Sequence, residues 1–219
     1  MERRSALKNM GMAFGYVVAT PTLLGILQSC EKKPDYAEWV PSFFDKDKGY
    51  ALAQTVDIIL PKTDTPSATE INVHGFIDAF MAEVLPDEQR DFVKMKMDKF
   101  YEKVLMNSGK ESLMDVDSED IEPTLKTYLK KRSEEDEESH IESINSYMEA
   151  IMQGGEASLD DDVACFSFAN DIRDITIWAY KSSEYIGEEV LAYLPIPGEY
   201  IPCEDVNVLT GGKDWSVKR

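Results

Sequence analysis

The sequence has few of the residues from which catalytic and metal-binding centres are built. Its 219 residues include only three cysteines and two histidines. It has no C-x-x-C-H segment for haem attachment and no cysteine set for an iron–sulfur cluster. Glycine-rich dinucleotide and phosphate-binding motifs are missing, and so is the G-x-S-x-G motif of serine hydrolases. We therefore expect no catalytic, cofactor-binding or metal-binding residues in this chain.

His74 lies at the start of a predicted helix, and the sequence near it offers no second metal ligand. A buried structural or capping role is the favoured interpretation of His74. Metal binding is the alternative.

Basic residues are also scarce. The chain has 23 lysines and arginines against 42 aspartates and glutamates, a formal net charge of -19. Such a surface repels nucleic acid and anionic headgroups, so we expect no nucleic-acid partner and no basic membrane-binding face. The acidic run EEDEE at residues 134–138 is interpreted as a solvated linker or helix end, with a cation or partner site as the alternative.

Residues 1–29 have the layout of a bacterial export signal. A twin-arginine pattern comes first, and an apolar run over residues 10–27 follows it. A transmembrane helix is the alternative, but glycines and a proline interrupt the run, and charge flanks it only on the N-terminal side. An amphipathic helix of a soluble domain would need polar residues at helical spacing, which are almost absent here. The export-signal residues are Arg3, Arg4, Leu7 and Lys8.

Cys30 stands where a lipoprotein signal ends. We expect cleavage before Cys30 and lipid attachment to it, which would place the chain outside the cytoplasm, on the periplasmic side and anchored to a membrane. An exported compartment permits a disulfide between the other two cysteines, Cys165 and Cys203. The sequence does not fix their distance, so two free thiols are the alternative.

The rest of the chain is predicted to be one domain behind a tether. Residues 1–29 form the signal, residues 30–49 an irregular tether, and residues 50–219 a helical domain of ordinary size. The tether contains three large aromatic residues, which we expect to dock on the domain or on a partner: Trp39, Phe43 and Phe44.

Apolar residues in the domain recur with the period of an α-helix. The helix near residues 159–180 is apolar on most sides and includes Trp178, so we expect it to be central, with Ser158 as its N-cap. The tail from residue 196 is predicted to be extended. We expect an all-α fold, an irregular multi-helix domain with an extended N-terminal tether and a C-terminal tail. The predicted helices lie near residues 52–60, 73–85, 87–107, 121–129, 141–152, 159–180 and 188–194.

Several strings in the domain occur in a recognisable order. They are IILPKTDTPSA at residues 58–68, VHGFID at 73–78, SEYIGEE at 183–189 and LAYLPIPGEY at 191–200, followed by Cys203 and Trp215. Together they resemble the gluconate 2-dehydrogenase subunit 3 family, whose members typically read I-I-P-x-T-D-T-P-G-A, V-x-x-F-I-D, T-S-E-I-G and P-G-x-Y. The chain departs from this pattern by the inserted Leu60 and by Ser67 in place of glycine. Residues 106–156 carry none of the resemblance.

The resemblance implies a non-catalytic small subunit of a membrane-bound sugar or sugar-acid dehydrogenase. The large partner would be a flavoprotein that holds FAD, and a separate cytochrome c subunit would hold haem. The small subunit would carry the export signal and escort the folded flavoprotein across the membrane.

The residues of these strings favour two roles about equally. Proline, threonine and aspartate at residues 61–66 can build a rigid loop, and tyrosines are enriched at protein interfaces. The strings are therefore either turn and core chemistry of a helical domain or a direct partner contact. The candidate interface residues are Trp39, Phe43, Phe44, Asp64, Pro66, Tyr185 and Tyr200.

A rival function comes from another class of protein. The chain would then be a free-standing acidic surface lipoprotein that binds a glycan or an envelope component. A self-sufficient hydrolase is a weaker third possibility, because neither a triad nor a metal-ligand set is evident.

Overall fold

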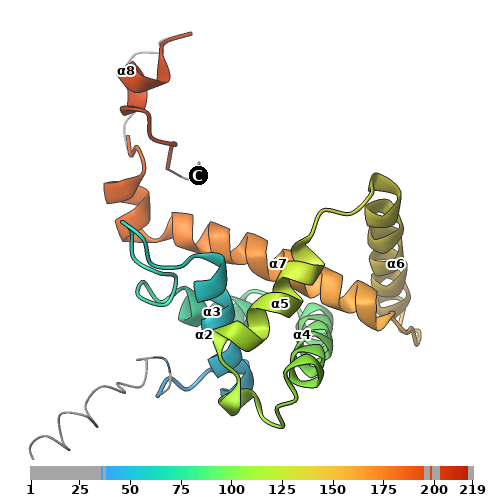
Figure 1. Cartoon of the computed structure of the whole chain (residues 1–219). Helices are drawn as coiled ribbons and strands as arrows, with labels where there is room; N and C mark the ends of the chain where they lie inside the picture. The colour runs from blue at the N-terminus through green and yellow to red at the C-terminus, as the bar shows by residue number, and fades with distance from the viewer. Residues whose placement is uncertain (1–35, 37, 195–197, 199–202, 217–219) are drawn as a thin grey trace, which may run out of the picture. The chain divides into compact units, whose positions relative to one another are not determined.

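Helix α7 (Asp161–Ser182) is the element on which the other helices pack. The computed structural model describes residues 36, 38–194, 198 and 203–216, and the helices of this part belong to the compact unit Trp39–Arg219. Helices α2, α3, α4, α5 and α6 all contact α7, which crosses the unit as the long orange helix in Figure 1. The prediction that this segment is the central helix is confirmed. Its N-cap is Asp160 rather than Ser158, because the Asp160 carboxylate accepts from two backbone N–H groups of the first turn.

The unit is all-α, as the sequence predicted. Within the described residues the only β-type pairing is an isolated bridge between Ala192 and Trp215. The other elements, in chain order, are α2 (Lys46–Ile59), α3 (Val73–Glu83), α4 (Asp87–Ser108), the 3-10 turn η2 (Leu113–Asp115), α5 (Ser118–Leu129), α6 (Glu134–Met152), the π-helical turn η3 (Tyr185–Val190) and α8 (Val206–Thr210).

Three segments differ from the prediction. Helix α2 begins at Lys46, so the last four residues assigned to the tether are helical. The turn η3 covers Tyr185–Val190, whereas a short helix was expected over residues 188–194. The tail contains α8, whose N-cap Asp205 accepts from the backbone N–H of Asn207. These elements are a single turn or a helix end, where too few apolar positions exist for a period to be recognised.

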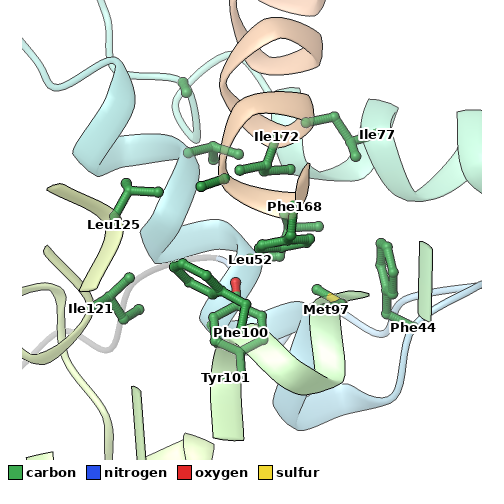
Figure 2. Close-up of a cluster of buried hydrophobic side chains, with 14 of the residues drawn as sticks. Phe44, Leu52, Ile77, Met97, Phe100, Tyr101, Ile121, Leu125, Phe168 and Ile172 are labelled. Carbon is green, nitrogen blue, oxygen red and sulfur yellow. The ribbon is translucent and has the colours of Figure 1, made fainter. Parts of the chain in front are cut away.

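The main core lies where α2, α4, α5 and α7 meet. Figure 2 shows Leu52, Phe100, Ile121 and Phe168 pointing toward one another, and all four are buried. Tyr101 is buried beside them and shares a hydrogen bond of 2.8 Å with the Thr55 hydroxyl. Burial raises the pKa of the Tyr101 phenol, so the hydroxyl stays neutral in this core. Apolar burial of this kind is the dominant favourable term in folding.

Helix α6 is peripheral. None of its residues is buried, and it packs on α7 at one side of the unit (Figure 1). The acidic run is its first turn, where four carboxylates oppose the positive end of the helix dipole and Ser133 caps the backbone. The interpretation of this run as a helix end is confirmed.

Side-chain contacts hold α6 against its neighbours. The His140 Nδ1 lies 2.6 Å from the Asp136 carbonyl oxygen, and its Nε2 is 3.1 Å from an Arg132 nitrogen. Arg132 also pairs with Asp162 of α7 at 3.2 Å. Arginine beside the Asp162 carboxyl lowers its pKa against the opposing effect of burial.

Cys165 is a buried free thiol and Cys203 an exposed one, so the structure does not join them by a disulfide. Burial raises the pKa of the Cys165 thiol. Among the described residues, no helix combines the length and apolar character needed to cross a lipid bilayer. The predicted export and lipid residues Arg3, Arg4, Leu7, Lys8 and Cys30 lie outside the described residues.

Candidate functional site

Two of the recognisable strings, at residues 58–68 and 183–189, lie at the C-terminal end of α7. The Tyr180 hydroxyl donates to the Pro66 carbonyl oxygen at 2.7 Å and lies 3.0 Å from the Thr65 hydroxyl, joining residues more than 110 positions apart. Tyr180 itself is buried. The 61–68 loop is thereby fixed against α7. Ile71, which follows this loop, lines a groove of about 380 Å³ together with Ser183, Glu184, Tyr185, Glu188 and Glu189.

Two carboxylates hold the rest of the loop. Asp57 on α2 accepts from the Thr69 backbone N–H at 2.8 Å and from its hydroxyl at 2.6 Å. Glu70 accepts from the Ser67 backbone N–H and pairs with Lys62, and this pairing lowers the pKa of Glu70. The loop is rigid, as its composition predicted, and Asp64 projects from it as an exposed residue.

Replacing Tyr180 by phenylalanine tests how the loop is held. The ring can stay in place, but the Pro66 carbonyl loses its donor and the Thr65 hydroxyl loses the neighbouring phenol oxygen, so we expect Tyr180→Phe to lower the free energy of unfolding by about 1 kcal/mol. Amides of residues 61–68 should also exchange faster with deuterium. Tyr185→Phe is the matched control, because Tyr185 is half exposed and should change neither quantity. Equal exchange in both variants would contradict this assignment.

Asp78 fastens residues 39–44 to helix α3. Its carboxylate accepts from the backbone N–H groups of Ser42 at 2.6 Å, Phe43 at 3.0 Å and Phe44 at 3.1 Å. Asp78 is only 2% exposed. A buried carboxylate needs such donors, because burying a charge without hydrogen bonds is costly. The aspartate of the VHGFID string is therefore a structural clamp.

The aromatic residues of the tether pack on this domain to different extents. Phe44 is 7% exposed and belongs to the core cluster, so it cannot serve as an anchor for a partner. Trp39 is half buried, and its ring lies edge-on to His74 with the ring centroids 4.8 Å apart. It also lies close to Gly49 of α2. A larger residue at position 49 would collide with Pro41. Phe43 is half buried beneath the Lys94 ammonium. His74 is buried, as expected, and burial lowers its pKa.

A solvent-facing set of rings was missed in the sequence. Phe76 and Phe80 of α3 and Trp178 of α7 form what we call the aromatic patch, with ring centroids 5.4 Å apart for Phe76–Trp178 and 5.6 Å for Phe80–Trp178. Phe76 is 42% and Trp178 43% exposed. Their helical period predicted core positions for them, because apolar rings at helical spacing on a core helix look the same whether their outer edge is covered or not.

Of the proposed interface residues, the structure brings some together and not others. Asp64 and Pro66 lie on the loop held by Tyr180, and Tyr185 lies on the groove next to Ile71. Trp39 and Phe43 lie on the other part of the domain fixed by Asp78. Tyr200 lies outside the described residues. Across the described part of the chain, no group of three or more histidine, cysteine, aspartate or glutamate side chains is arranged to hold a metal ion.

Fold and site together define an all-α domain with an exposed aromatic surface on α3 and α7, beside a loop that is fixed to the end of α7. A family model described as Gluconate 2-dehydrogenase subunit 3 matches residues 46–198, which is more than two thirds of the chain. The match begins at the first residue of α2 and includes the loop, the aromatic patch and η3. The chain belongs to the gluconate 2-dehydrogenase subunit 3 family, and the family name describes a subunit of a dehydrogenase complex.

The other two comparisons gave no relatives. No curated protein matches the chain. No solved structure matches it.

Proposed function

We propose that this chain is the non-catalytic small subunit of a membrane-bound, flavin-dependent sugar or sugar-acid dehydrogenase. The observation that supports this is the family match over residues 46–198, which covers the whole helical body from α2 to η3. The substrate would be oxidised in a large partner subunit that holds FAD. Electrons would leave through a separate cytochrome c subunit that holds haem.

The second part of the proposal concerns export. The pattern at Arg3 and Arg4 is typical of a twin-arginine export signal. Twin-arginine export is generally used by proteins that fold before they cross the membrane. A flavoprotein must fold around its FAD, so a small subunit with this signal can escort it. After export, Cys30 would carry lipid and hold the complex on the periplasmic side of a membrane.

The hydrogen bonds of the domain suit an escort. Tyr180, Asp57 and Asp78 fix the loop and residues 39–44 before any partner arrives. A surface fixed in advance loses less conformational entropy when it binds. The chain's own residues therefore do the work of binding and positioning, and the proposal assigns them no chemical step.

Affinity purification from the native host tests the complex. The full chain would carry a tag after Arg219 and be recovered in mild detergent while the dehydrogenase is expressed. We expect a large flavoprotein to co-purify, identified by mass spectrometry and by flavin absorbance. Recovery of this chain alone would contradict the escort proposal and favour a free-standing acidic lipoprotein.

The export signal can be tested separately. In a chain with both Arg3→Lys and Arg4→Lys, we expect precursor to accumulate in the cytoplasm, because lysine replaces two planar guanidinium groups with point charges. Normal export of that variant would identify an ordinary lipoprotein signal instead. Cys30→Ala should be exported without lipid, which mass spectrometry of the N-terminal peptide would show. Lipid on that variant would remove Cys30 as the attachment site.

A further inference from the structure

We infer that the aromatic patch of Phe76, Phe80 and Trp178 is the surface that binds the large dehydrogenase subunit. The matching surface of that subunit would be an apolar area surrounded by lysine and arginine. This inference rests on the proposed function for the existence of that subunit. The aromatic patch, rather than the aromatic residues of the tether, would be the main anchor for this partner. Those rings are used inside the domain, with Phe44 in the core and Trp39 against His74.

The patch has the composition of an interface centre. Each ring touches another ring of the patch, yet Phe76 and Trp178 leave more than two fifths of their surface in water. Aromatic residues at the centre of an interface contribute most of its binding energy. Helices α3 and α7 hold the rings on a rigid base, since both helices also bury residues in the core.

The patch continues toward the groove at the end of α7. Helices α3 and α7 pack antiparallel, so Phe76 lies beside Trp178 while Ile71, before α3, lies beside Tyr185. Tyr185 is half exposed and adds an apolar ring with a polar tip. The strings at residues 58–68 and 183–189 therefore lie toward one end of the patch.

The charge around the aromatic patch indicates what kind of partner can bind there. Four exposed glutamates lie on the elements of the patch and the groove, and within the structurally described residues none has an ion-pair partner: Glu83, Glu184, Glu188 and Glu189. Of the nearby cations, Lys62, Arg173 and Lys181 are each paired with a carboxylate, and the Lys213 ammonium donates to the Glu189 backbone carbonyl oxygen at 3.3 Å. A symmetric contact between two copies would set these glutamates against each other, on chains whose net charge is -19. A partner with basic residues around an apolar centre satisfies both features.

Variants of the patch test the inference in the full tagged chain, recovered from the native host. We expect Trp178→Ala to raise the Kd for the flavoprotein by about 30-fold, the effect of losing one interface hot spot, and so to reduce its recovery. Met152→Ala is the matched control, because Met152 is a more exposed apolar residue on α6 and should leave recovery unchanged. Circular dichroism of each purified variant would show that the fold is kept.

A charge reversal gives a second test that leaves the rings intact. We expect Glu188→Lys to weaken recovery and to reduce its dependence on salt, whereas Glu135→Lys in the acidic turn of α6 should change neither. If the wild-type chain recovers the flavoprotein, and Trp178→Ala and Glu188→Lys recover it equally well, the patch is not the binding surface. The proposed function would still stand. Failure of the wild-type chain to recover any flavoprotein would overturn both. A second copy of this chain as the only recovered partner would also overturn both, and its loss in Trp178→Ala would identify the patch as a self-association surface.

Discussion

Asp78→Ala is expected to lower the free energy of unfolding by about 3 kcal/mol, a large effect for a single substitution. The variant leaves three backbone N–H groups of residues 42–44 without their acceptor. It also leaves a space beside the backbone of Phe44, whose side chain is part of the core. Urea unfolding of the purified chain, followed by circular dichroism, measures the change through the midpoint.

Two further variants sharpen this prediction. Asp78→Asn keeps the oxygen that accepts from Phe43 and Phe44 but can turn an amide nitrogen toward the Ser42 N–H, so we expect a loss of about 1.5 kcal/mol. Asp64→Ala is the matched control, because it removes the same kind of side chain from an exposed loop position. An Asp78→Ala midpoint equal to that of Asp64→Ala would show that residues 39–44 are not held by this carboxylate.

Asp171→Ala is expected to cost about 2 kcal/mol, and Lys96→Met in the same chain to restore most of it. The Lys96 side chain is only 4% exposed, and its ammonium pairs with Asp171, donates to the Ser167 hydroxyl at 3.0 Å and lies over the Phe92 ring. Removing Asp171 leaves a buried charge with a single neutral acceptor. Solvent reaches the Asp171 side chain, which is 63% exposed, so the loss is smaller than for a fully buried pair.

The double variant is the informative one. Methionine has nearly the length of lysine without its charge, and the surroundings of Lys96 include Phe44, Val93 and Phe168. A double-mutant cycle on urea midpoints should therefore be strongly non-additive. Glu122→Ala, which breaks the exposed Glu122–Lys126 pair on α5, serves as the control and should change stability by less than about 0.5 kcal/mol. Additive effects of Lys96→Met and Asp171→Ala would refute the buried-pair interpretation.

The helical part of this fold could be predicted because its signals are local. Pro61 and Pro86 follow the ends of α2 and α3, and Gly109 adopts the left-handed conformation that ends α4. Apolar residues at helical spacing did the rest. The start of α2 was missed because residues 45–48 are all charged and Gly49 reads as a helix breaker, so no apolar period marks the first turn.

The surface could be predicted only in part. The loop and Tyr185 were recognised as special, but Tyr180, which holds the loop, comes from a helix far along the chain and looked like an ordinary core residue. The same limit explains the aromatic patch, since the period of a helix fixes which residues share a face and not whether another helix covers that face. The opposite error was made for Phe44, which was named as a candidate interface residue but lies in the core. No pattern in a short irregular segment distinguishes a ring that enters the core.

The peripheral position of α6 has a consequence for how unfolding is observed. Because α6 buries none of its residues and is held by a few polar and ring contacts, it can open while the core of α2, α4, α5 and α7 stays packed. The three tryptophans are Trp39, Trp178 and Trp215, and none belongs to α6. Opening of α6 would therefore reduce helical circular dichroism without altering tryptophan fluorescence. We therefore expect a denaturation curve that is two-state by fluorescence and broader by circular dichroism, with the difference between the two curves reporting the separate opening of α6.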